Sequence, residues 1–187
     1  IRFLFLPATI GAITWLARNE DHLDRIAHGL VLTCIGDEGP FHYKKTVNGA
    51  VVDVATEHVL RHSGQAFEVL DFSPYGYDER QYGSPGLALP VGCLMRAIHG
   101  TFPEYHTSLD NCDFVTSEAL GQSFRLLADL LDLLQRNATY RRVDGRGEPQ
   151  LGRRGLYRDP APAELPSGPL WFKRPRLFRA APASSES

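Results

Sequence analysis

The sequence predicts an α/β domain built on a mostly parallel sheet. Three short apolar runs, at 2–7, 29–36 and 66–72, are typical of buried strands. Segments with helical periodicity, at 9–26 and 50–64, lie between them. Strands that alternate with helices along the chain favour a parallel sheet covered by helices.

The first half of the chain supplies two of these strands and one helix. The run "RFLFLP" (2–7) predicts a short buried strand that ends at Pro7. The segment 9–26 predicts a helix in spite of Gly11, because its apolar residues recur on one side. The run "GLVLTCIG" (29–36) is bounded by glycines and predicts a second buried strand.

The middle of the chain predicts an edge strand, a helix and a third buried strand. Residues 39–49 alternate in polarity and favour an edge strand. Residues 50–64 have helical spacing, and Gly64 is a fitting C-terminal stop. Its expected buried face consists of Val51, Val54, Ala55, His58, Val59 and His62. The run "AFEVLDF" (66–72) follows as a strand.

The strongest helical pattern covers residues 117–137. Its apolar residues follow a regular spacing along one face: Leu120, Phe124, Leu127, Leu131 and Leu134. Thr116 or Ser117 can cap the start, and Glu118 sits favourably in the first turn.

Composition narrows the class of protein. The chain has 187 residues, 43% hydrophobic and 22% charged, with a net charge of −2, so we expect a globular protein without a nucleic-acid partner. Its apolar runs are too short or too charged to cross a bilayer, so we expect no membrane partner. Its three cysteines are widely spaced, which favours a reducing cytoplasm. From about residue 159 the composition becomes proline-rich, so we expect a domain over 1–158 and a flexible tail over 159–187.

Two polar loops are the candidate sites. The first, 73–86, carries aromatic, acidic and basic side chains between prolines and glycines: Tyr75, Tyr77, Asp78, Glu79, Arg80 and Tyr82. The second, 100–111, contains Tyr105, His106 and Asp110. Either loop alone is equally consistent with a surface turn, since neither contains an HExxH zinc motif or a glycine-rich phosphate loop.

The two loops together resemble a known family. "YDERQYGSPGLALPVG" followed by "PEYHTSLDN" is similar to the end of the zinc aminopeptidase fold shared by bacterial secreted aminopeptidases and glutaminyl cyclases. The chain most resembles a bacterial aminopeptidase-like branch, through "PATIGAITWLARNE", "GLVLTCIGD", "DFSPYGYDERQYGSPG", "PVGCLMRAIHG" and "GEPQLGRRGLYR". The resemblance implies a three-layer α/β sandwich, of which this sequence looks like the C-terminal part, with the N-terminal part missing.

The resemblance also assigns roles to residues. His106 would bind zinc, and Asp110 would hydrogen-bond from behind it and fix the ring. Tyr105 would point its hydroxyl at the oxygen of the scissile carbonyl. Asp78 and Glu79 would orient the metal-bound water, move its proton or hold the substrate amine.

The sequence departs from the family pattern at other ligand positions. The paired glutamates of the wider fold correspond to Ala8 and Thr9, and a metal aspartate corresponds to a place near Thr33. We therefore expect at most one zinc ion, with its remaining ligands upstream of this sequence, and Glu79 as the first candidate for the general base. We also expect exposed apolar surface near the start of the chain and the 29–36 run, around Phe3, Phe5, Leu30 and Leu32, and aggregation of residues 1–187 alone.

Three functions remain open at this stage. The first is a zinc aminopeptidase-like hydrolase acting on a peptide or an aminoacyl amide, with oligomerisation possible. The second is a non-catalytic remnant or binding module of the same fold. The third, weaker alternative is an acyltransferase or cyclase.

Overall fold

The computed structural model describes residues 1–139, 141, 146–147 and 150. The unit Ile1–Asn137 contains every helix and strand described below. The predicted domain boundary at 158 and the predicted tail 159–187 lie outside the described residues. No helix of the described residues is long and apolar enough to span a membrane.

A mixed four-stranded sheet forms the centre of this unit. Its strands are β1 (Gly29–Leu32), β2 (Phe41–Lys44), β3 (Phe67–Leu70) and β4 (Val91–Met95), in the order β1-β4-β2-β3. The β1–β4 and β2–β3 pairs are parallel, whereas β2 and β4 are antiparallel. The predicted α/β class is confirmed, and the sheet itself is mixed.

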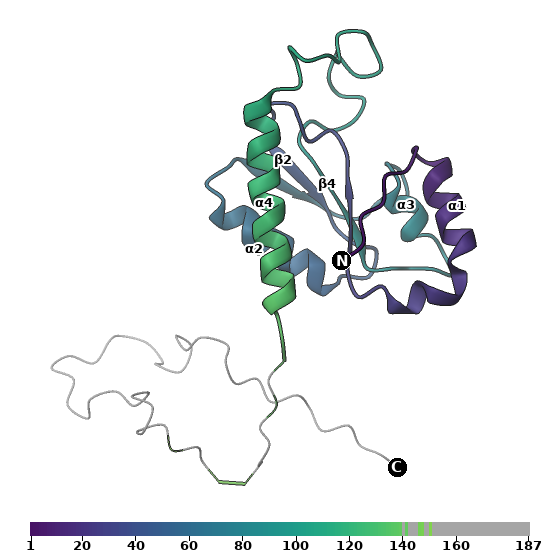
Figure 1. The fold of residues 1–187 in the computed structure, drawn as a ribbon, viewed down its shortest axis with the longest axis vertical. Helices are drawn as coiled ribbons and strands as arrows, with labels where there is room; N and C mark the ends of the chain where they lie inside the picture. Colours follow the sequence, from purple (N-terminus) through teal and green to yellow (C-terminus); the bar gives the residue numbers. More distant parts are fainter. Residues whose placement is uncertain (140, 142–145, 148–149, 151–187) are drawn as a thin grey trace, which may run out of the picture. The chain divides into compact units, whose positions relative to one another are not determined.

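Helices cover both faces of the sheet (Figure 1). On one face, α2 (Val51–His62) and α4 (Ser117–Arg136) pack against each other. On the other, α1 (Ile10–Arg18), the 3-10 helix η1 (Glu20–Arg25) and the short α3 (Glu79–Tyr82) gather near β4. Thr116 caps α4 as expected, since its hydroxyl accepts a hydrogen bond from the Ala119 N–H at 3.2 Å.

Each face of the sheet has its own apolar core. Phe41, Tyr43 and Leu94 point to the α2–α4 side, where Leu60 and Leu130 are also buried. The other core joins α1, η1, α3 and the start of β4 through Ala12, Leu16, Leu23, Tyr82, Leu89 and Val91. Because side chains alternate along a strand, Lys44 and Cys93 point to the α3 side, where they are neighbours in the β2–β4 register.

Three local predictions are wrong. Residues 2–7 form no strand, and the exposed Phe3 and Phe5 (70% and 94%) show that this apolar run pairs with no described strand. The expected edge strand within 39–49 lies inside the sheet, between β3 and β4. The buried face predicted for 50–64 is right for Ala55 and Val59 but wrong for Val51 and Val54, which are exposed, while Asp53 and Thr56 are buried.

The expected exposed apolar surface is largely present. Phe3, Phe5 and Leu32 are exposed, whereas Leu30 is half-buried against the core of the α2–α4 face.

Asp53 is buried because it satisfies the turn that joins β2 to α2. Its carboxylate accepts hydrogen bonds from the Tyr43 hydroxyl at 2.7 Å, the Thr46 N–H at 2.9 Å and hydroxyl at 2.5 Å, and the Ala50 N–H at 2.6 Å. Burial alone would raise the pKa of Asp53, but the hydrogen bonds from Thr46, Tyr43 and Ala50 outweigh it and lower the pKa.

We therefore predict that Asp53→Asn lowers the free energy of unfolding at neutral pH by about 1.5–3 kcal/mol, the range for hydrogen bonds to a charged group. Because the folded-state pKa is lowered, the charged form stabilises the fold above the unfolded-state pKa, and this contribution is lost as the pH falls below about 4. Urea unfolding at several pH values measures both effects. Asp71→Asn is the control, since that side chain is 92% exposed; an equal loss in both variants would contradict the assignment.

Candidate active site

A buried ion pair lies at the centre of the candidate site. Lys44 of β2 contacts Glu79 of α3 with 2.9 Å between Nζ and Oε1, and the two side chains are 6% and 0% exposed. Oε1 also accepts from the Tyr77 N–H at 3.2 Å, and Lys44 donates to the Tyr75 carbonyl oxygen. The pair therefore holds the 73–78 segment against the sheet.

The space around this pair is tight. A Cβ atom at Gly76 would lie 2.0 Å from Glu79 Oε1 and 2.6 Å from Lys44 Nζ, so only glycine fits there. Cys93 lies beside Lys44 in the sheet register. Burial first, and then the charge of Glu79, raise the pKa of the Cys93 thiol well above its ordinary value, so this thiol stays protonated and unreactive.

Three tyrosine rings surround His99, which lies just beyond the end of β4. Their centroids are 6.1 Å (Tyr75), 5.6 Å (Tyr77) and 6.4 Å (Tyr105) from the centroid of the imidazole. Burial lowers the pKa of His99, with a smaller opposing effect from the charge of Glu79, so the ring is neutral at pH 7. His99 thus joins the loop that contains Tyr75 and Tyr77 to the loop that contains Tyr105.

The parallel sheet that the sequence predicted is not what brings these two loops together. If β3 and β4 were parallel, the loops that follow them would leave the same edge of the sheet. The β2–β4 pair is antiparallel, so β3 and β4 end at opposite edges. The ring contacts with His99 nevertheless bring the two loops together.

Two polar atoms in this cluster are buried without a hydrogen-bond partner among the described residues. They are Glu79 Oε2 and His99 Nδ1. Leaving a buried polar atom unpaired costs roughly 1–3 kcal/mol, so such atoms call for an explanation, and a bound group is one.

The loop of the predicted metal ligand lies on the outer side of this cluster. The ring of the exposed His106 stacks on Tyr105 with centroids 4.0 Å apart, and its φ of 58° is in the left-handed region, which few non-glycine residues adopt. Burial, followed by the neighbouring Tyr77, raises the pKa of Tyr105, so its hydroxyl keeps its proton. In the described part of the chain no hydrogen bond joins Asp110 to His106, and the role of Asp110 behind the ring stays a prediction.

Asp78 lies beside Glu79 and Tyr82. Burial, and then the charge of Glu79, raise the pKa of Asp78, and the charge of Asp78 contributes in turn to the raised pKa of Tyr82. Its Oδ1 is buried and has no partner among the described residues. Glu79 lies at the centre of the cluster, because it contacts Lys44 and Tyr77 and its charge acts on His99.

The described residues do not form a zinc site by themselves. Within them, no three His, Cys, Asp or Glu side chains lie together as metal ligands. Ala8, Thr9 and Thr33, at positions that match ligands of the wider fold, carry no carboxylate. His106 is thus the one residue here that matches the ligand pattern.

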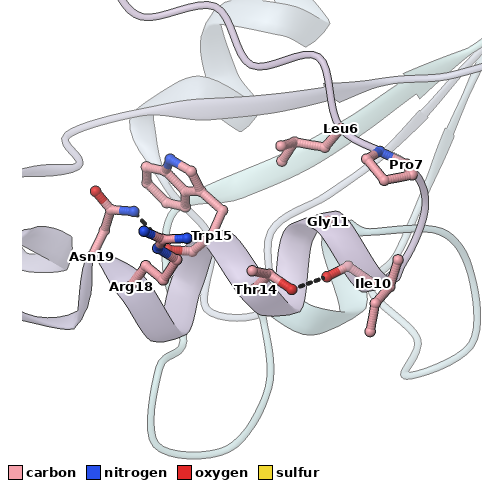
Figure 2. Close-up of a pocket in the computed structure, with 8 residues that line it drawn as sticks. All are labelled: Leu6, Pro7, Ile10, Gly11, Thr14, Trp15, Arg18 and Asn19. Atoms are coloured by element: carbon pink, nitrogen blue, oxygen red, sulfur yellow. Dashed lines mark hydrogen bonds between the residues drawn. The ribbon is translucent and has the colours of Figure 1, made fainter.

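A pocket elsewhere in the fold is unsuited to the same chemistry. It lies between the N-terminal segment and α1 (Figure 2) and is lined by Leu6, Pro7, Ile10, Gly11, Thr14, Trp15, Arg18 and Asn19. The side chains of Thr14 and Asn19 donate hydrogen bonds to the carbonyl oxygens of Ile10 and Trp15 in α1. No carboxylate, imidazole or thiol lines it, so it offers no general acid or base.

Sequence reasoning missed two residues of the cluster, Lys44 and His99. The single signal for His99 was its place in "CLMRAIHG", directly after a buried strand and before a glycine. Lys44 gave no signal, because an alternating strand predicted on the edge makes a lysine an ordinary exposed residue.

Comparisons with known proteins agree with this architecture. Residues 1–137 match a family model described as a domain of unknown function, DUF4910, and residues 138–164 match a winged helix-turn-helix model. A "Putative polysaccharide biosynthesis protein with aminopeptidase-like domain" from Clostridium acetobutylicum is 49% identical over 158 residues, which are 84% of this chain and 36% of that protein.

A crystal structure is also similar. It is that of a "putative peptidase" from Clostridium acetobutylicum, with a TM-score of 0.74 and 47% sequence identity over 82% of this chain and 36% of that one. The chain thus spans about a third of the length of the relatives it matches.

The ion pair gives a sharp mutational comparison. We predict that Lys44→Met lowers the free energy of unfolding by about 3–5 kcal/mol, because it leaves Glu79 buried without its charge partner. The neighbouring Lys45→Met is the matched control and should change it by less than about 1 kcal/mol, because Lys45 pairs with an exposed Asp71. Urea unfolding monitored by tryptophan fluorescence measures both. Equal losses would show that burial of the pair has no energetic consequence.

Proposed function

Since the chain belongs to the DUF4910 family and resembles proteins described as aminopeptidase-like, we propose that it forms part of a hydrolase that cleaves an amide bond next to a free amine. One observation carries this proposal: the two polar loops meet at His99, near a fully buried carboxylate with one oxygen that has no partner among the described residues. Such a cluster is typical of a substrate site, because the carboxylate is held in place before the substrate arrives.

The proposal divides the chemistry among the residues of this chain. Glu79 presents Oε2, since Oε1 is occupied by Lys44 and Tyr77, and would hold the amine or accept a proton. Tyr105 keeps its hydroxyl proton and would donate it in a hydrogen bond to the carbonyl oxygen as negative charge develops there. Asp78, whose pKa is raised, is the second candidate for proton transfer.

Zinc enters the proposal only in the complete protein. His106 would be one ligand, Asp110 would orient it, and the other ligands would come from beyond the described residues, which hold no such group of three. A zinc ion in such a site activates water as a nucleophile at neutral pH. We propose a peptide or an aminoacyl amide as the substrate and the cytoplasm as the compartment.

A second candidate is a binding module of the same fold without catalysis. The lack of a metal-ligand triad among the described residues favours it, as do the residues at the places of the paired glutamates, Ala8 and Thr9. A complete protein that binds aminoacyl amides without hydrolysing them would identify this alternative.

We predict that in the complete protein His106→Ala weakens zinc binding by at least about 100-fold, because it removes a direct ligand rather than a supporting group. Isothermal titration calorimetry with zinc measures the affinity, and release of p-nitroaniline from leucine p-nitroanilide measures the activity. His28→Ala, which changes an exposed histidine far from the loop in sequence, is the control. Tight zinc binding that survives His106→Ala would refute the ligand assignment.

We predict that Tyr105→Phe lowers kcat for leucine p-nitroanilide by about 10²-fold and leaves KM nearly unchanged. The reason is that a hydroxyl donating to the developing oxyanion acts mainly in the transition state. Tyr75→Phe, in an exposed ring of the same cluster, is the matched comparison. A change in KM alone would show that Tyr105 contributes to substrate binding and not to catalysis.

A further inference from the structure

His99 and Glu79 belong to the same cluster, and each has one buried polar atom without a hydrogen-bond partner among the described residues. His99 Nδ1 and Glu79 Oε2 are both buried and unpartnered among the described residues, and the charge of Glu79 acts on His99. The two side chains come from different elements, the segment after β4 and α3, so the fold brings them together. Lys44, the neighbouring cation, already donates to Glu79 Oε1 and the Tyr75 carbonyl oxygen.

The chemistry of the two atoms selects the kind of group that would fill this place. An ionised carboxylate oxygen only accepts hydrogen bonds, and a neutral imidazole accepts one at the nitrogen that carries no proton. With the proton on Nε2, both atoms need N–H or O–H donors. A protonated primary amine supplies three donors from one atom, so it matches a place that offers acceptors and no donors.

The aromatic wall favours the same group. Tyr75, Tyr77 and Tyr105 lie around His99, and the faces of such rings attract a cation. The Tyr75 ring is 77% exposed, so it covers His99 from the solvent side without being packed in the core.

We infer that His99 is a substrate-binding residue that, together with Glu79, holds the primary amine of the substrate inside the ring of three tyrosines. The inference rests on the proposed function, which requires a free amine but assigns it no partner other than Glu79. Among the described residues, the charges that act on His99 are those of Glu79 and Lys44, and the rings beside it are those of the three tyrosines. His99 then determines specificity for substrates with a free amino terminus.

Binding of leucinamide to the complete protein tests this inference without relying on hydrolysis. With histidine labelled by ¹³C, leucinamide should shift the ring resonance of His99, and N-acetyl-leucinamide, which lacks the amine, should not. His99→Ala should weaken leucinamide binding by about tenfold or more, the scale of one well-placed hydrogen bond. His28→Ala should leave it unchanged.

The outcomes separate this inference from the proposed function. Equal leucinamide affinity in wild type and His99→Ala, equal binding of the acetylated compound, or no binding by the wild type would overturn it. If His99→Ala does not fold, the shift of the His99 resonance that leucinamide causes in the wild type still tests the inference. Leucinamide binding through His99 without hydrolysis of leucine p-nitroanilide would uphold the inference while the hydrolase proposal fails. In an active protein, His99→Gln should raise KM more than it lowers kcat.

Discussion

The site depends on the buried contact between Lys44 and Glu79. Two opposite charges with side chains 6% and 0% exposed are stable only as a pair, because each would pay several kcal/mol to be buried alone. The pair fixes α3 to β2 and holds the Tyr75–Tyr77 segment through one carbonyl oxygen and one N–H. It also restricts position 76 to glycine, since any Cβ there would overlap both charged atoms. The carboxylate of the candidate site is therefore also the one that anchors the loop.

The mixed sheet explains why the site lies over a face of the sheet. Active sites of open parallel sheets lie beyond the carboxyl ends of the strands. Here β4 is antiparallel to β2, and the loops after β3 and β4 start from opposite edges. Lys44 and Cys93 project from the same face, Glu79 contacts Lys44 there, and the rings of Tyr75, Tyr77 and Tyr105 lie around His99. The aromatic contacts thus replace the shared edge as the constraint that brings the loops together.

The sequence was informative where a pattern has one physical meaning. Alternating apolar runs and helical periods identified the α/β class and the positions of α2, α4 and three of the strands, because burial imposes these periods. The strand predicted at 2–7 is absent, because an apolar run predicts burial but does not supply the neighbouring strand that hydrogen bonding needs. The prediction of the buried face of α2 missed Asp53, because hydrogen bonds across a turn stabilise this buried residue and no hydropathy pattern encodes them. Glu79 and Tyr105 were identified from their loops, whereas Lys44 and His99 depend on tertiary contacts formed by residues far apart in sequence.

Burial also gives the acidic residues of the site different capabilities. Glu79 is fully buried but has a cation on one oxygen, so its free oxygen suits a positively charged or donating group. Asp78, next to it, has no cation at hydrogen-bond distance among the described residues, and burial together with the charge of Glu79 raises its pKa, which suits proton transfer nearer neutral pH. His99 is kept neutral by burial, so it adds a hydrogen-bonding atom to the cluster without adding a charge that would repel an amine. The environments of Glu79, Asp78 and His99 therefore differ in charge and hydrogen bonding, and the proposed division of roles rests on these differences.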